Sequence, residues 1–367
     1  MPDAMPHECG DFLLYGATGY TGELIARRAT ATGLRPVLAG RRAEAVAGLA
    51  GELGLPHRAA ALDDPAALDA AVAAIHSKHP LVLNCAGPFA HTARQVSDAC
   101  LRRRAHYLDI TGEMAVFEAM AARGADAERA GVMLLPGVGF DVVPSDCLAA
   151  YVARQLPSAT RLTIAIQGIG GRLSRGTALT SLQNIDGGGA VRREGRIVRV
   201  PPAWRVRAVD FGDGPARVTT MPWGDVSTAY HSTGIPNVEV YMAIPTSLRL
   251  AMRYGRVALP LLASPPVQRW LASLVRRMPA GPTLEQRARG QSRFWAEASD
   301  DAGARAAARL FGPEGYEFTV RSAVECVRRA LRGDACPGFQ TPSRAFGPDL
   351  VLAIEGVRRE DMTGRAP

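Results

Sequence analysis

The sequence predicts an α/β protein: a doubly wound parallel sheet in an amino-terminal domain, then an α+β domain built on a largely antiparallel sheet. Two observations predict the first domain. Short apolar runs alternate with segments of helical length, which is the pattern of parallel βαβ units. The first of these runs also ends in a glycine-spaced turn. A third observation, alternating apolar and polar residues beyond residue 160, predicts the second domain.

The first strand is expected over residues 12–15, which are all apolar, as in a strand covered on both faces. A turn follows, and then a helix over residues 23–29. Gly16 permits the tight turn, Gly19 lets a phosphate approach the backbone, and Gly22 lets the helix pack close to the strand. Amide groups at the helix start then face the pyrophosphate of a dinucleotide. This Rossmann-like pattern has one residue more between its first two glycines than the commonest fingerprint.

The second strand, residues 35–40, runs out into Arg41 and Arg42, about twenty residues after the turn. A protein that binds NAD usually has Asp or Glu at this place, whereas an arginine accommodates the 2′-phosphate of NADP. Because no acidic residue ends this strand, the sequence predicts NADP, with NAD less favoured. The alternative is that both arginines are solvated charges at the start of the next helix.

Four further strands complete the first sheet, at residues 57–62, 81–84, 106–110 and 132–135, and Asp64 is expected to cap a helix that continues to Ile75. The fourth strand ends in a glycine and proline turn at the carboxyl edge, where open α/β folds bind ligands. This loop is expected to contact the cofactor. The predicted cofactor-binding residues are Gly16, Ala17, Thr18, Gly19, Tyr20, Thr21, Gly22, Arg41, Arg42, Cys85, Ala86, Gly87 and Pro88.

In the second domain, alternation predicts strands near residues 161–167, 196–200, 205–211, 226–231 and 238–244, with a short helix over 176–182. Residues 245–280 are apolar, basic and interrupted by prolines, and so can lie on a membrane surface, line an acyl-binding groove or simply pack against the sheet. The last part of the sequence is expected to form a helix over residues 316–330 and a closing helix through Ile354. The expected domains are therefore 8–145, 146–315 and 316–358, the last returning to the first.

The charge, the cysteine spacing and the apolar runs of the sequence exclude several classes of protein. The 367 residues carry a net charge of +8, but the arginines are scattered, so nucleic-acid binding is not indicated and anionic small molecules are favoured. The six cysteines are spaced for neither a metal site nor a disulfide framework. With no signal-peptide pattern in residues 1–10 and no apolar run long enough to span a bilayer, we expect a cytoplasmic protein.

Lys78 is the only lysine of the chain. A Tyr-x-x-x-Lys catalytic pair is excluded because Ala74 lies four residues before it. A phosphate loop with its lysine has no candidate either, and Schiff-base chemistry is not expected.

With these segments placed, the chain resembles the saccharopine dehydrogenase-like oxidoreductases, a broad family that includes bacterial trans-acting enoyl reductases. The resemblance is carried, in the family's order, by residues 15–22, 39–42, 84–89, 107–113 and 136–146, and more weakly by 176–178 and 341–342. It implies an NAD(P)-binding domain and a second domain that supplies substrate contacts and the contacts of a homodimer.

The enoyl reductase branch implies reduction of a hydrophobic acyl or enoyl substrate of lipid metabolism by an NADP-dependent enzyme. One alternative is a saccharopine-type amino-acid dehydrogenase, which the near absence of lysine disfavours. Another is a non-catalytic NADP-binding module at a lipid surface.

In an enoyl reductase, hydride transfer creates an enolate on the substrate. The candidates for holding it are Tyr107, His91 or amide groups of the loop 87–91, although Tyr107 can equally be a core residue and His91 a helix start. Asp141 belongs to an acidic group near strand ends that also holds Asp109, Glu113 and Asp146. These residues can hold the ribose, serve the hinge to the second domain or form a proton path, and the alternative is that they only cap helices, which is favoured for Asp146. Tyr230 and His231 of the second domain can reach the cofactor cleft from the other side, or can equally be the end of an exposed strand.

Overall fold

The computed structural model describes residues 10–171, 174–176, 178, 188–255 and 264–362. The chain forms two compact units. Unit 1 comprises Met1–Asp141 and Thr319–Phe346, and unit 2 comprises Val142–Phe318 and Gly347–Pro367. Each unit has its own sheet.

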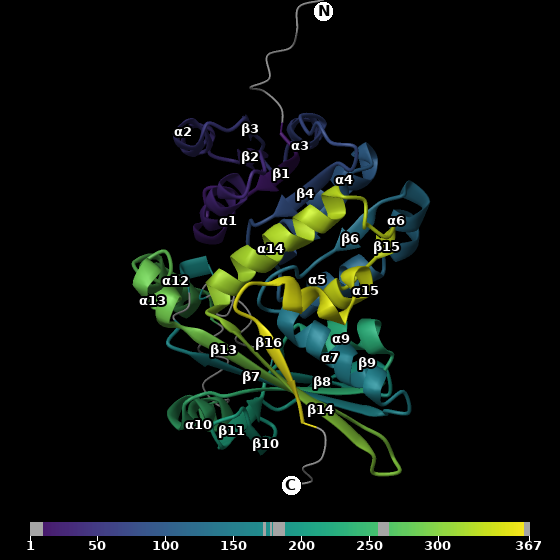
Figure 1. Cartoon of the computed structure of the whole chain (residues 1–367). Helices are drawn as coiled ribbons and strands as arrows, with labels where there is room; N and C mark the ends of the chain where they lie inside the picture. The colour runs from purple at the N-terminus through teal and green to yellow at the C-terminus, as the bar shows by residue number, and fades with distance from the viewer. Residues whose placement is uncertain (1–9, 172–173, 177, 179–187, 256–263, 363–367) are drawn as a thin grey trace, which may run out of the picture. The chain divides into compact units, whose positions relative to one another are not determined.

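The sheet of unit 1 is parallel throughout and has the strand order β15-β6-β5-β4-β1-β2-β3 (Figure 1). Its strands are β1 (Phe12–Tyr15), β2 (Pro36–Gly40), β3 (His57–Ala59), β4 (Leu81–Asn84), β5 (His106–Asp109), β6 (Met133–Leu135) and β15 (Gly338–Phe339). From β1 the chain first builds outward through β2 and β3, then crosses to β4 on the other side. The strand order therefore reverses between β1 and β4, and this switch point is where open α/β sheets bind ligands, at the carboxyl edge.

The helices of unit 1 connect these strands: α1 (Tyr20–Ala31), α2 (Ala43–Leu53), α3 (Pro65–Ala73), η1 (Phe89–His91), α4 (Ala93–Arg103), α5 (Met114–Ala121), α6 (Gly124–Ala130) and α15 (Pro342–Phe346). All residues of β1, β2 and β4 are buried, as expected for strands covered on both faces. The predicted cap of α3 is confirmed, because Asp64 accepts a hydrogen bond from the Ala67 amide (2.9 Å).

The helix α14 (Gly315–Leu331) belongs to unit 1 from Thr319 onward. Its Arg328 guanidinium donates to the Thr32 carbonyl after α1 (2.9 Å). Its Ser322 hydroxyl donates to the Val138 carbonyl (2.8 Å), and its Thr319 hydroxyl accepts from the Phe140 amide (3.0 Å). A late segment of the chain thus fixes the loop that follows β6.

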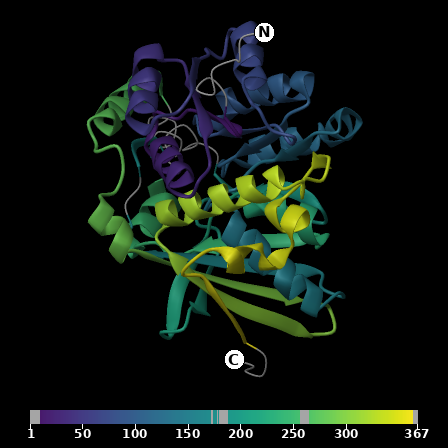
Figure 2. The same ribbon diagram turned by 45° about the horizontal axis from the view of Figure 1, so that its top comes forward.

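Unit 2 contains a nine-stranded mixed sheet with the order β10-β11-β12-β7-β13-β14-β16, to which β8 and β9 add beside β12. Its strands are β7 (Arg161–Ile169), β8 (Gly189–Arg193), β9 (Arg196–Val200), β10 (Val206–Asp210), β11 (Pro215–Thr220), β12 (Asn237–Met242), β13 (Gln291–Ser299), β14 (Arg305–Pro313) and β16 (Arg358–Asp361). Among the described residues of this sheet, β7 and β12 pair in parallel and the other strand pairs are antiparallel. In Figures 1 and 2 the yellow β16 lies beside the green β14.

The helices of unit 2 are α7 (Val143–Gln155), α9 (Asp225–Thr233), α10 (Thr246–Tyr254), α12 (Pro265–Arg276), α13 (Leu284–Arg289) and the 3₁₀ helix η3 (Pro348–Ala353). Helix α7 packs on one face of the sheet, against β13 and β14. A parallel sheet in the first unit and a largely antiparallel sheet in the second confirm the predicted fold class. No helix in the described part of the chain is long and apolar enough to cross a bilayer.

One predicted strand is wrong: residues 226–231 lie within helix α9. The helix follows Gly224 and ends at Gly234, which is left-handed (φ 74°) as helix ends favour. Residues 225–229 are all buried against neighbours that include α7, so tertiary packing overrides the strand preference of Val226 and Thr228. The helix predicted over 176–182 lies mostly outside the described residues.

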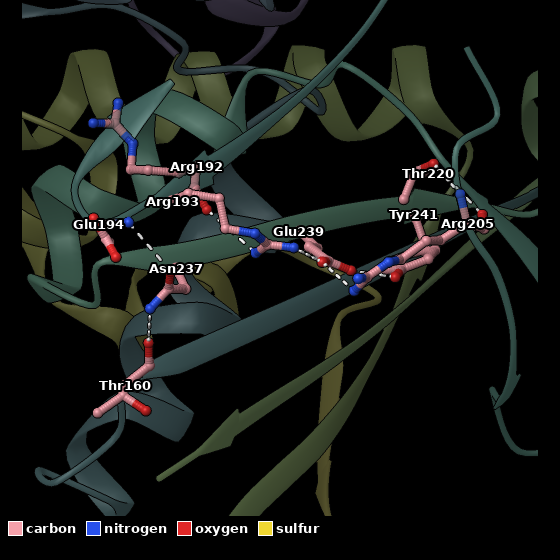
Figure 3. A network of polar contacts seen from close by, with 9 residues as sticks. All are labelled: Thr160, Arg192, Arg193, Glu194, Arg205, Thr220, Asn237, Glu239 and Tyr241. Carbon is pink, nitrogen blue, oxygen red and sulfur yellow. Dashed lines mark hydrogen bonds and ion pairs between the residues drawn. The ribbon is translucent and has the colours of Figure 1, made fainter. Parts of the chain in front are cut away.

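A buried carboxylate joins the strands at one end of the second sheet (Figure 3). Glu239 of β12 accepts hydrogen bonds from Arg193 of β8, from Arg205 (2.9 Å) and from the Tyr241 hydroxyl. Burial alone would raise the pKa of Glu239, but the hydrogen bonds from Tyr241 and Arg193 together with the arginine charges hold it below its usual value. The ionised form of Glu239 therefore helps to hold β8 and the β10–β12 edge together.

Candidate functional site

The glycine-rich turn after β1 is closed by backbone contacts that leave no room for a side chain at its first position. Gly16 has φ +81°, and its amide donates to the Ala39 carbonyl at the end of β2 (2.8 Å). A Cβ on Gly16 would lie 2.7 Å from the Ala86 amide nitrogen after β4. The ends of β1, β2 and β4 therefore converge on Gly16, and only glycine fits there.

The third glycine of the turn allows helix α1 to approach the strand end. A Cβ on Gly22 would lie only 2.3 Å from the Gly16 carbonyl oxygen, and the Gly19 amide donates to the same oxygen (3.0 Å). Gly19 is the N-cap of α1, and no side-chain hydrogen bond caps this helix start. First-turn amide groups have no acceptor within their own helix, so this end of α1 presents donors suited to an anion.

Both predicted arginines lie at this edge of the sheet, directly after β2. Arg42 is exposed, and its guanidinium Nη2 lies 3.5 Å from the Thr18 hydroxyl of the turn. Arg41 is also exposed; burial raises the pKa of the Tyr15 phenol at the end of β1, and the positive charge of Arg41 opposes this. The structure thus brings the glycine turn and the two cations together.

The loop after β4 is held by side chains that the sequence-based list of cofactor-binding residues lacks. Asn84 accepts from the Ala86 amide (3.0 Å), and the Thr92 hydroxyl donates to the Ala86 carbonyl (2.6 Å). The Glu113 carboxylate accepts from the amides of Phe89 (2.8 Å) and Ala90 (2.9 Å). The sequence gives one indication of this support, because Asn84 is a polar residue at the end of an otherwise apolar strand.

These contacts correct one expectation. The amides of Phe89 and Ala90 donate to Glu113, and the His91 amide donates to the Pro88 carbonyl (3.1 Å). They are therefore engaged in fixing the loop rather than directed at a substrate. Cys85, in the same loop, is half-buried, and burial raises the pKa of its thiol, with the nearby charge of Asp109 adding to the effect.

Asp109, at the end of β5, is a fully buried carboxylate that ties three segments together. Its Oδ1 accepts from the amides of Thr111 and Gly137 (2.9 Å each), and its Oδ2 accepts from the Tyr107 hydroxyl (2.7 Å). Burial raises the pKa of Asp109 to about 6, although these hydrogen bonds act in the opposite direction. It joins the turns that follow β5 and β6.

For Tyr107 the structure supports the core alternative. Its side chain is fully buried, its hydroxyl donates to Asp109, and it accepts from the Asn84 amide (3.3 Å). Burial raises the pKa of this phenol well above its ordinary value. Tyr107 therefore holds β4 and β5 in register and is not placed to touch a substrate.

The other two candidates for catalysis are more accessible. His91 is exposed at the end of η1. Asp141 is half-buried, and its carboxylate occupies the space above Gly112, where a Cβ would lie 2.6 Å from Oδ2. Burial raises the pKa of Asp141 to about 6, so that it exchanges protons close to neutral pH.

The remaining residues of interest lie in unit 2. Asp146 is inside helix α7, where it accepts from the Ser232 hydroxyl instead of acting as the N-cap. Tyr230 is on α9, with the Arg192 guanidinium 4.5 Å from its ring centre, and His231 follows it. Within the described residues, no group of three or more His, Cys, Asp or Glu side chains could hold a metal ion.

Comparison with known proteins bears on the first domain. Residues 12–135, which are 124 of the 367 residues, match the sequence profile described as the saccharopine dehydrogenase NADP binding domain. The match confirms the predicted resemblance over these residues, which include the glycine-rich turn after β1.

Two named relatives have modest identity over part of the chain. A trans-acting enoyl reductase of Mycobacterium bovis (strain BCG / Pasteur 1173P2) is 32% identical over 145 residues, which are 37% of this chain and 34% of that protein. A saccharopine dehydrogenase-like oxidoreductase of Mus musculus is 27% identical over 164 residues, 39% of this chain and 37% of the relative. The chain thus matches little more than a third of each relative's length.

Among solved structures, the apo histidine-tagged saccharopine dehydrogenase (L-Glu forming) of Saccharomyces cerevisiae has the same fold. The match covers 96% of this chain and 100% of the yeast chain, with a TM-score of 0.64 and 11% sequence identity. At this identity the likeness extends to the fold and not to the substrate.

The residues present fit the dinucleotide that the family implies. The space between Gly16, Gly22 and the Ala86 backbone admits no Cβ, as a pyrophosphate turn requires. Arg41 and Arg42 follow β2 at the same edge of the sheet, the place where NADP-binding proteins of this fold commonly have an arginine, and the loop from Cys85 to Pro88 adjoins Gly16 at the switch point.

We predict that Gly22→Ala weakens NADPH binding about tenfold or more, because its Cβ would push α1 away from the Gly16 carbonyl by a shift costing roughly 1–3 kcal/mol. Gly48→Ala is the matched control, since a Cβ at this helical position meets nothing within 4 Å. Fluorescence titration with NADPH measures both. Equal affinities of the two variants would contradict the assignment.

We also predict that Asp109 makes stability fall as the pH rises. The pKa of Asp109 is about 6 in the folded protein and 3.8 in the unfolded chain. The contribution of Asp109 to the free energy of unfolding is therefore complete below the unfolded pKa and is lost as the pH rises through the folded pKa. Urea unfolding should show the stability of the wild type relative to Asp109→Asn decreasing by up to about 3 kcal/mol between pH 4 and 7. A difference that does not change with pH would show that this carboxyl is not titrating as described.

Proposed function

We propose that the chain is an NADPH-dependent reductase of a hydrophobic acyl or enoyl thioester. The observation that carries this proposal is the convergence of the glycine turn, Arg42 and the loop after β4 at the switch point of an NADP-binding domain. The relative named as a trans-acting enoyl reductase supports the choice of substrate class. The near absence of lysine argues against amino diacid chemistry, which commonly uses that residue.

In this proposal the cofactor is held by the main chain and by two cations. The amides at the start of α1 bind the pyrophosphate, and the guanidinium groups of Arg42 and Arg41 bind the 2′-phosphate. Glu113 and Thr92 keep the loop after β4 at a fixed position beside the turn. When bound, NADPH supplies a hydride to the β-carbon of the substrate.

The protein must then deal with the charge that this transfer leaves on the thioester. The two electrons of the hydride reduce the carbon–carbon double bond, and an enolate forms that takes a proton at the α-carbon. Asp141 is the proton donor of this proposal, because its pKa of about 6 leaves a protonated fraction near neutral pH. His91, which is exposed at the end of η1 after β4, is the proposed contact for the enolate oxygen.

Cofactor choice is predicted to depend on Arg42 more than on Arg41, because Arg42 lies beside the turn. Arg42→Ala should weaken NADPH binding by about 1.5–3 kcal/mol and leave NADH binding nearly unchanged. Both nucleotides are titrated against this variant and against the control Arg94→Ala. Arg94 is a suitable control because its side chain on α4 is 87% exposed. If the variant keeps the preference for NADPH, Arg42 does not select the cofactor.

The reaction itself is tested by NADPH oxidation, followed by absorbance, with a medium-chain enoyl thioester as substrate. We predict turnover by the wild type and a strong loss in Asp141→Asn, with NADPH affinity retained. The wild-type rate should fall as the pH rises above about 6, where Asp141 loses its proton.

Two outcomes would replace the proposal. Oxidation of an amino diacid with NADP⁺, with indifference to enoyl thioesters, would indicate a saccharopine-type dehydrogenase. NADPH binding without turnover of either substrate class would indicate a non-catalytic binding module.

A further inference from the structure

A long stretch of unit 2 carries positive charge without any acidic residue. Between Glu239 and Glu285 the sequence has six arginines and no Asp, Glu or Lys, so this stretch supplies +6 of the chain's net charge of +8. Helices α10 and α12 both lie within it. We call residues 245–278 the basic amphipathic segment, and the inference concerns its described residues.

Helix α12 (green in Figure 1) presents an apolar stripe to solvent. Trp270 and Leu274 are four residues apart, so they lie on one side of the helix, and they are 60% and 41% exposed. Arg269 and Arg276 are seven residues apart and lie together on another side, both exposed. None of the side chains that the structure describes in α12 is buried.

Helix α10 has the same character. It has no buried residue, and its Leu250 and Tyr254 are exposed at a spacing of four residues. Arg249 and Arg253, also four residues apart, lie together on the adjacent side. Packing against the sheet, one of the expected alternatives, leaves no described side chain of either helix fully buried. Single exposed apolar residues are ordinary, but two helices that expose aromatic and leucine side chains beside arginines indicate a binding surface.

The charge of this segment selects among possible partners. A symmetric dimer through α12 would place the exposed Arg269 and Arg276 of one copy against the same surface of the other, because a two-fold interface pairs a surface with itself. An anionic lipid surface has the complementary charge. Trp and Tyr side chains also favour the boundary between lipid headgroups and acyl chains, and arginines beside an apolar face are typical of helices that lie in this boundary.

We propose that the basic amphipathic segment binds the surface of a membrane that contains anionic phospholipids, with the apolar stripe of α12 as the principal contact. Trp270 and Leu274 insert at the headgroup level while the arginines contact lipid phosphates. This inference does not depend on the proposed reductase activity, because it rests on the exposed side chains of unit 2 alone.

The test is co-sedimentation of the full chain with vesicles of phosphatidylcholine, with and without phosphatidylglycerol. We expect binding to the anionic vesicles, little binding to the neutral ones, and a shift of tryptophan emission to shorter wavelength. High salt should weaken binding, since each arginine near an anionic surface contributes about fivefold in affinity.

The variant is the double substitution Trp270→Ser, Leu274→Ser, and its matched control is Leu352→Ser in η3, because Leu352 is 42% exposed and Leu274 is 41% exposed. The double variant should lose at least tenfold in vesicle affinity and lose the emission shift, while the control binds like the wild type. Circular dichroism verifies that both variants are folded.

No binding to anionic vesicles, or equal binding by the double variant and the wild type, would overturn the proposal. If the wild type does not bind vesicles but self-associates, and the double variant does not self-associate, the proposal is overturned and a second copy of the chain occupies this surface. Binding that is lost only in a Leu250→Ser, Tyr254→Ser variant would transfer the principal contact to α10 and so overturn the role given to α12.

Discussion

The close approach of main chain to main chain after β1 is the constraint on which the candidate site depends. The Gly16 carbonyl occupies the space that a Cβ on Gly22 would fill, and the Ala86 backbone occupies the space that a Cβ on Gly16 would fill. This contact fixes the start of α1 against the ends of β1 and β4, and so fixes the amide groups of its first turn. Preorganised amides of this kind bind a phosphate without the entropic cost of ordering a flexible side chain.

A second layer of buried polar groups supports this contact from the neighbouring strands. Asn84 and Asp109 are paired across β4 and β5, and the Tyr107 hydroxyl bonds to both. Asp109 extends the connection to Gly137 after β6, and Glu113 fixes the loop after β4. Side chains that looked suited to chemistry from their type alone thus hold the loops in place, because a buried polar group is stable only with its hydrogen bonds made.

Much of unit 1 could be predicted from the sequence, because its signals are local. The strand over Leu81–Asn84 and the cap at Asp64 have the predicted positions, and the glycine spacing marks the turn. The role of Tyr107 could not be predicted, since its partner Asn84 is 23 residues away and becomes a neighbour only through strand register. Helix α9 was missed because its strand-favouring residues are held in a helix by packing and by Gly234.

Hydrogen exchange measured by mass spectrometry, with and without NADP⁺, tests the central claim most directly. The amides of residues 16–23 should exchange more slowly when the nucleotide is bound, and those of α13, Leu284–Arg289, should not change. If NADP⁺ binds while exchange over residues 16–23 stays the same, the glycine-rich turn does not hold the pyrophosphate and the account of the site is wrong.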